Sequence, residues 1–250
     1  MKRLVGAWLA IVLVSSTGNP ARADDKDPQP ILDKAIQALG GEAKLKKAES
    51  ATWKSKGTIT FNGNDNTINI HATVQGLDHY RAEVEGEFGG NEVKGVVVLN
   101  GNKGWRKFGE KMEMDEDNVA NEKRGIYLQV IPMRILPLKD KGFKVEAAGE
   151  EKVGDKPAVG IKVTPPDGKT FTLHFDKESG LPVKLVAKVV GFGGEEYTQE
   201  TLYKDYKDFD GIKKATKVQS KRDGEDFLKG ELTEFKTLDK VDPKTFAEPE

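Results

Sequence analysis

The sequence predicts a mainly β fold: one large curved antiparallel sheet, an incomplete β-barrel, with an amino-terminal helix and a mid-chain helical lid or plug. Three observations lead to this prediction. Runs of alternating polar and apolar residues recur at strand length, Gly-containing turns separate them, and one strongly apolar segment interrupts them midway. The runs predict about twelve strands, and an open sheet of that size tends to curl. The helices are then available to fill its concave face.

The clearest hairpins lie near the carboxyl end of the chain. Asp210-Gly211 and Asp223-Gly224 divide this region into three runs, 202–209, 212–222 and 227–238. A type I′ turn needs a positive φ at both central residues, which Gly gives freely and Asp tolerates. We therefore expect a three-strand meander here. The same kind of dipeptide recurs upstream, at Asn62-Gly63, Asn100-Gly101, Asp167-Gly168 and Ser179-Gly180.

Residues 1–23 have the pattern of a secretory signal peptide. Lys2 and Arg3 precede the apolar run 4–14, which is too short to span a membrane, and Ala21-Arg22-Ala23 is a small-residue cleavage motif. We expect cleavage after Ala23 and a periplasmic location, with an uncleaved anchor as the less favoured alternative. Residues 24–30 are predicted to be a flexible tether. Residues 31–250 then form a single domain with no transmembrane segment.

Composition restricts the possible partners. The chain contains no Cys, so no disulfide stabilises the domain and a hydrophobic core must do so. Removing the three basic residues of the signal peptide leaves 37 Lys and Arg against 41 Asp and Glu, a formal net charge of −4. These charges are dispersed along the predicted strands. The pattern disfavours binding to nucleic acid or to an anionic membrane surface.

The elements follow in chain order. Apolar residues at helical spacing predict a helix over 31–39, with Gly40-Gly41 as its stop and a second helical turn over 42–47. From Ala51 the period changes to two, which predicts half-buried strands. The stretch 93–99 is continuously apolar and predicts a strand that is covered on both faces. Strand character continues to residue 114 and resumes at residue 143.

The apolar segment 126–138 is the predicted lid or plug. Pro132 lacks the backbone N–H that a helix interior needs, so we expect the helix to break there. Residues 115–121 are acidic and are expected to be a lead-in without a helix cap. The segment has two interpretations: a core helix that closes an ordinary β domain, or a movable cover over an apolar cavity.

Motifs of catalysis are absent from the sequence. His71, His79 and His174 lie on the polar phase of predicted strands and are expected to be ordinary surface residues, so no metal site and no cofactor are predicted. No G-x-S-x-G motif occurs, and the Gly-rich stretches 86–90 and 191–194 are not followed by a helix that could bind phosphate. We therefore do not expect an enzyme.

Four short segments carry a resemblance to a known family: Gly76–Arg81, Val97–Trp105, Asp205–Ile212 and Phe246–Pro249. Together they resemble the periplasmic outer-membrane lipoprotein carriers, the LolA-like family, in a divergent secreted subgroup. The resemblance implies an incomplete β-barrel with helices lying in its mouth and an apolar cavity that takes acyl chains. It also implies a basic residue that latches the lid. That residue is missing near Gly76, and Arg81 is the nearest candidate for the lid contact.

The predicted function is a periplasmic, monomeric binding or carrier protein for a lipid or an acylated protein. The alternative is a protein-interaction or envelope-sensor module that binds an envelope protein and fills its interior with its own side chains. For the carrier, the predicted ligand-binding residues come from the inward phase of the strands and from the lid: Trp53, Phe61, Tyr80, Val84, Val97, Leu99, Trp105, Ile126, Val130, Ile131 and Met133.

Overall fold

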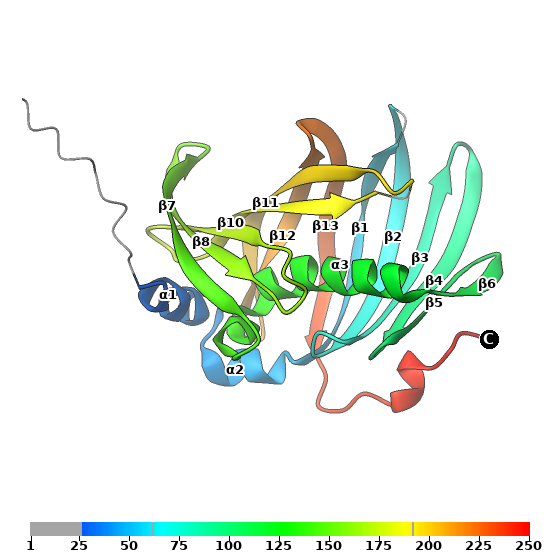
Figure 1. Cartoon of the computed structure of the whole chain (residues 1–250), viewed down its shortest axis with the longest axis horizontal. Coiled ribbons are helices and arrows are strands. Elements are labelled where there is room, and N and C mark those ends of the chain that lie inside the picture. The colour runs from blue at the N-terminus through cyan, green and yellow to red at the C-terminus, as the bar shows by residue number, and fades with distance from the viewer. Residues whose placement is uncertain (1–26, 62, 192) are drawn as a thin grey trace, which may run out of the picture.

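A single sheet dominates the fold. A computed structural model of the chain describes residues 27–61, 63–191 and 193–250. In these ranges thirteen antiparallel strands pair in the order β6-β5-β4-β3-β2-β1-β13-β12-β11-β10-β9-β8-β7 (Figure 1). The edge strands β6 and β7 do not pair with each other, so the sheet curves without closing and the predicted fold class is confirmed.

The strands have these bounds: β1 (Ser50–Phe61), β2 (Asn64–Gln75), β3 (His79–Phe88), β4 (Asn91–Asn100), β5 (Lys103–Phe108), β6 (Glu110–Glu113), β7 (Lys144–Val153), β8 (Lys156–Thr164), β9 (Phe171–Asp176), β10 (Pro182–Val190), β11 (Glu196–Phe209), β12 (Ile212–Arg222) and β13 (Glu225–Thr237). Strand β13 pairs with β1, and this pairing joins the first six strands to the last seven.

The predicted meander is confirmed as β11, β12 and β13. At its turns φ is +52° for Asp210 and +82° for Gly211, and +47° for Asp223 and +89° for Gly224. Each turn therefore has positive φ at both central residues, as the type I′ hairpin requires.

Two short helices close one end of the sheet. In α1 (Gln29–Leu39) the apolar face that the sequence predicted is buried, and α2 (Glu42–Lys47) follows directly. Gly40 has a φ of +131°, and a Cβ there would lie 2.3 Å from the carbonyl oxygen of Gly211. Only Gly allows the end of α1 to approach the β11–β12 turn so closely. The helix begins at residue 29, so the last two residues of the predicted tether belong to it. The predicted signal peptide lies outside the described residues.

The apolar mid-chain segment forms α3 (Glu116–Arg134), which crosses the concave face of the sheet (Figure 1). Two predictions for it are wrong. The acidic stretch 115–121 starts the helix, because the carboxylate of Asp115 caps it by accepting from the N–H of Asn118 at 2.8 Å. Pro132 does not break the helix. It lies in the last turn, where its missing N–H costs one bond, to the carbonyl of Leu128.

The helix ends at Ile135, whose φ is +61°, and a short 3-10 helix, η1 (Leu136–Lys139), follows. No helix in the described ranges is long and apolar enough to cross a membrane.

Apolar side chains are buried on both faces of the sheet. The main core lies on the concave face, between the strands, α1 and α3. A smaller cluster on the convex face joins Val96, Val98 and Trp105 to Val241 and Phe246, at the 3-10 helix η2 (Pro243–Phe246). The carboxyl-terminal segment thus covers the outer face of the second half of β4, which confirms the prediction of burial on both faces for residues 96–99, whereas Lys94 is exposed.

Candidate ligand-binding site

A cavity of about 590 Å³ lies between α3 and the concave face of the sheet. Its floor is formed by apolar, small and charged residues of β1, β2, β12 and β13, and residues of β10 and β11 line it as well. Leu39 of α1 also belongs to the lining. Ligand pockets in proteins commonly have volumes of roughly 300–1,000 Å³, so the space suits a small molecule or an acyl chain.

Facing glycines leave part of the floor without side chains. Gly57 of β1 pairs with Gly230 of β13, and both line the cavity. A Cβ at Gly57 would lie 2.1 Å from the carbonyl oxygen of Lys229 and 2.9 Å from the Cα of Gly230. The two strands are too close for a side chain here, and bare backbone borders the cavity.

One face of α3 forms a wall of the cavity. Its lining residues recur at spacings of three and four, the period of one helix face: Asn121, Arg124, Gly125, Leu128, Gln129, Pro132 and Met133. A Cβ added at Gly125 would meet no other atom within 4 Å. Gly125 is exposed, so this open space lies at the solvent-accessible edge of the cavity.

The other side of α3 belongs to the core. Ile126, Val130 and Ile131 are 1%, 2% and 0% exposed and pack with the apolar residues of the sheet. The prediction that they line the cavity is therefore corrected, whereas Met133 does line it. The segment is therefore a core helix on one side and a wall of the cavity on the other, while its movement stays a prediction.

Of the predicted residues on the sheet, Trp53 lines the cavity. Tyr80 and Leu99 are buried in the concave core, and Val84 and Val97 pack against that core without reaching the cavity. The ring of Tyr80 lies 6.3 Å from that of Trp53, and burial raises the pKa of the Tyr80 hydroxyl far above its ordinary value. These residues support α3 and Trp53 rather than a ligand.

Two other predicted residues lie away from the cavity. Phe61, at the end of β1, is 51% exposed. Trp105 lies on the convex face, in the cluster with Val98 and Phe246. Its register partner is Val98, which points away from α3, so alternation places Trp105 on the same outer face.

Arginine side chains hold the first half of α3. Arg106 of β5 pairs with Glu122 at 3.1 Å. Arg124, which is 4% exposed, donates to the main-chain carbonyls of Lys169 and Thr170, and its guanidinium lies 5.5 Å from the ring centroid of Phe171. Arg124 therefore connects α3 to the loop between β8 and β9.

A buried lysine holds the carboxyl end of α3. The Nζ of Lys214, on β12, donates to the main-chain carbonyl of Met133. In a continuing helix that carbonyl would accept from residue 137, which is a proline without an N–H. Burial lowers the pKa of Lys214 to about 7, and the neighbouring Arg134 guanidinium acts in the same direction. Lys214 lines the cavity and satisfies a carbonyl that the chain itself leaves unpaired.

The arrangement of an open curved sheet with a helix across its concave face is found in solved structures. A LolA superfamily protein from Nitrosomonas europaea matches with a TM-score of 0.58 at 11% identity, over 89% of this chain and 98% of that chain. The chain has a LolA-like fold. A DUF1329 family protein from Desulfovibrio piger matches with a TM-score of 0.56 at 12% identity, over 89% and 98%.

A third structure with this LolA-like fold is a domain from Vibrio parahaemolyticus, provisionally described as an outer membrane lipoprotein-sorting protein. It matches with a TM-score of 0.54 at 10% identity, over 86% of this chain and 97% of that chain. No family model and no curated protein matches the sequence.

Arg81, the predicted lid contact, does not reach the helix of this LolA-like fold. It pairs in register with Val98, which belongs to the convex cluster, and it binds Glu83 at 3.1 Å. Alternation along β3 therefore places Arg81 on the face opposite α3. Arg124 and Lys214 hold the helix instead. Lys214 could have been found from the sequence, because it shares the strand phase of Ile212.

The histidines also lie outside the cavity lining. His71 and His79 are paired with Glu83 and Asp78, as expected for accessible residues. His174 is only 8% exposed, so the prediction of a surface residue is wrong for it. Glu151 and Lys184 of neighbouring strands cover the ring, and burial lowers its pKa.

Proposed function

We propose that this chain is a secreted periplasmic carrier that binds a hydrophobic ligand, a lipid or the acyl chains of a lipoprotein, between the curved sheet and α3. The observation that supports this function is the cavity of about 590 Å³, with Trp53, Ile70, Leu128 and Leu232 among its lining residues. Burial of an acyl chain is worth about 0.8 kcal/mol per methylene. A cavity of this size gives enough contact for capture.

The alternative interaction module requires an interior filled by the protein's own side chains. The open space beside Gly125 and the bare floor at Gly57 favour a binding protein instead. Of the similar structures, one is described as a LolA superfamily protein, one as a DUF1329 family protein, and one by a role in lipoprotein sorting. These descriptions support a carrier rather than an enzyme.

The ligand would reach the cavity without displacing α3. Moving the helix would expose Ile126, Val130 and Ile131, and burying each such side chain is worth roughly 1.5–3 kcal/mol. We infer that the ligand enters the cavity at the end of the sheet near the β12–β13 turn, where Arg222 and Phe227 line the cavity. Release then depends on a partner with higher affinity for the ligand.

The proposed function is tested by a substitution on α3 that places a large side chain in the cavity. Residues 24–250 are purified as wild type, as Gly125→Phe and as Ala120→Phe, and bound lipids are extracted and measured by mass spectrometry. Phe at position 125 occupies the open space and also removes a helix-destabilising glycine, so we expect a folded protein with no loss of stability. Ala120 is exposed on the same helix and outside the cavity lining.

We expect lipid on the wild type and on Ala120→Phe, and a loss of at least about tenfold for Gly125→Phe. A tenfold loss corresponds to about 1.4 kcal/mol, the cost of excluding roughly two methylenes. Wild-type protein that neither retains lipid nor takes up added fatty acid would contradict the proposed function. Equal lipid content in all three proteins would mean that the lipid binds outside the space beside Gly125.

A further inference from the structure

Basic residues outnumber acidic ones among the residues that line the cavity, but only some of their side chains face it. The chain has 40 basic and 41 acidic residues. Among the residues that line the cavity eight are basic and only two, Glu196 and Glu231, are acidic. The basic residues are Lys56, Arg124, Lys169, Lys188, Lys213, Lys214, Arg222 and Lys229. Alternation along the strands turns the exposed side chains of Lys56, Lys188, Lys213 and Lys229 to the convex face, so the cations of the helix and strands that face the cavity are Arg124, Lys214 and Arg222.

Only some of these cations have acidic partners. Lys188 pairs with Glu196 at 2.7 Å, Lys56 with Glu231 at 3.5 Å, and Lys229 with Asp226 at 3.0 Å. Within the described ranges, no Asp or Glu pairs with the others. Arg124 and Lys214 are satisfied by main-chain carbonyls of the fold. Arg222 has no carboxylate and no main-chain carbonyl as partner among the described residues.

Arg222 is held in a fixed position beside the cavity. Its Nε donates to Oε1 of Gln199 at 3.1 Å, and its guanidinium lies 3.5 Å from the ring centroid of Phe227 and 5.4 Å from that of Tyr197. These contacts orient the guanidinium plane and, within the part of the chain that the structure describes, engage one of its nitrogens in a hydrogen bond. The Nη groups can therefore bind a planar or tetrahedral anion in the bidentate way that arginine favours.

Polar side chains continue from Arg222 along the same strand face. Ser220, two residues before it on β12, lies opposite Thr201 of β11, and their hydroxyl oxygens are 2.9 Å apart. Both line the cavity and are nearly buried. Farther along the strands, Trp53 and Leu39 line the cavity near α1. Hydroxyl groups thus lie beside Arg222 at one end of the space, whereas at the other end Trp53 and Leu39 lie near Lys214, whose amine is bound to the Met133 carbonyl.

We infer that the ligand is an acidic amphiphile, whose carboxylate or phosphate binds Arg222 beside Ser220 and Thr201 while its hydrocarbon chain extends toward Trp53 and Leu39. This inference rests on the proposed function and adds the chemical class of the ligand. A neutral lipid would leave the guanidinium without an anion. An acidic one forms a charge-assisted pair in a partly dehydrated site, which is stronger than the same pair in water.

Three ligands of equal chain length test the inference: dodecanoate, dodecyl phosphate and dodecanol. Binding to delipidated protein is measured by calorimetry and by the fluorescence of Trp53, which lines the cavity. We expect at least one of the two anions to bind about 10 to 100 times more tightly than the alcohol, the range for a hydrogen bond to a charged group. The better of the two anions identifies the headgroup.

Arg222→Met should remove this preference and leave dodecanol binding unchanged. Lys221→Met is the matched control, because Lys221 is the preceding residue on β12, is exposed, and pairs with Asp226 outside the cavity. If dodecanol binds as tightly as both anions to the wild type, the inference is wrong while the carrier function stands. If none of the three ligands binds, the proposed function itself fails. The comparison of the three ligands on the wild-type protein tests the preference for an anion even if Arg222→Met does not fold.

Discussion

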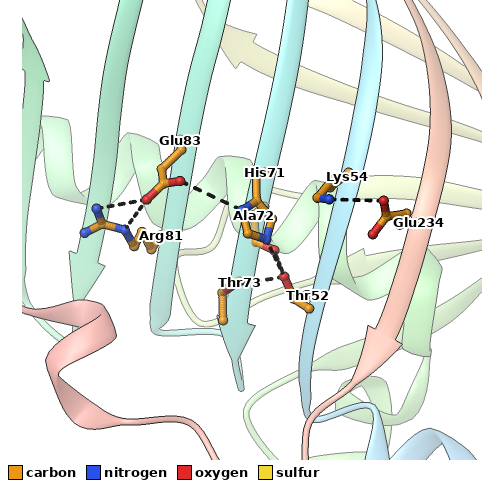
Figure 2. A network of polar contacts seen from close by, with 8 residues as sticks. All are labelled: Thr52, Lys54, His71, Ala72, Thr73, Arg81, Glu83 and Glu234. Carbon is orange, nitrogen blue, oxygen red and sulfur yellow. Dashed lines mark hydrogen bonds and ion pairs between the residues drawn. The ribbon is translucent and has the colours of Figure 1, made fainter.

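The two faces of the central strands differ in whether their charged side chains have partners of opposite charge. On the convex face of β1, β2, β3 and β13, basic side chains lie beside acidic ones, as in the network of Figure 2, where Lys54 binds Glu234 at 3.1 Å and Glu83 binds Arg81. His71 joins this network, 3.8 Å from Glu83. On the concave face, Arg222 lines the cavity without an acidic partner in the described ranges. The convex charges neutralise one another, whereas the concave charge is available to a ligand.

The faces also differ in packing. The convex cluster around Phe246 buries its apolar residues against the carboxyl-terminal segment. The concave face buries a larger core but keeps a cavity beside α3. Under the proposed function, the convex cluster contributes stability and the cavity of the concave face takes the ligand. The following predictions test this division, from the largest expected effect to the smallest.

Phe246→Ala should cost about 3–5 kcal/mol of unfolding free energy, because the side chain is 1% exposed in the convex cluster. Dodecanoate binding should not change. Denaturant unfolding and calorimetry measure the two effects. Phe61→Ala, the same substitution at a position that is 51% exposed, is the control and should change stability by less than about 0.5 kcal/mol. Weaker ligand binding in either variant would argue against the division.

Lys214→Met should flatten the dependence of stability on pH. The pKa of Lys214 falls from 10.5 to about 7 on folding, so between these values the unfolded chain binds more protons than the folded protein. Wild-type stability should therefore decrease as the pH falls from 9 to 7, by about 1–2 kcal/mol. The variant should lack this decrease in denaturant unfolding. An unchanged pH profile would show that Lys214 is not a buried, proton-releasing group.

Glu83→Gln should have the smallest effect. It removes the acidic partner of Arg81 and His71 on the convex face, where exposed ion pairs are worth at most about 1 kcal/mol. We expect a small loss of stability that disappears in high salt, and unchanged affinity for dodecanoate. A loss of ligand affinity would mean that the convex network influences the cavity.

The sequence predicted the fold because local patterns determine it. The Asp-Gly turns set the β11–β13 hairpins, alternation placed Trp53 on the concave face, and spacing of apolar residues predicted α1. Trp105 was misplaced because β5 has only six residues and β4 is apolar on both faces. The convex cover comes from residues after 238, which have no strand pattern of their own.

The site was harder to predict than the fold. Hydrophobicity marks residues that fill a core, and it correctly marked Ile126, Val130 and Ile131 as buried. The cavity wall contains, beside apolar residues such as Leu128, small or polar ones that remain accessible in the folded protein. Gly125 and Gln129 of α3 are of this kind, and nothing in the sequence distinguishes them from surface residues. Arg222 was not predicted because its position beside Gln199 depends on the pairing of β11 with β12.

A crystal structure of the delipidated protein with 12-bromododecanoate tests the central claim most directly, because anomalous scattering locates the bromine at the end of the hydrocarbon chain. We predict a bromine peak between the sheet and α3, next to Gly57 and Gly230 on the way from Arg222 to Trp53, with the carboxylate at Arg222. Bromine bound on the convex face, or a cavity that stays empty at saturating ligand, would contradict the account.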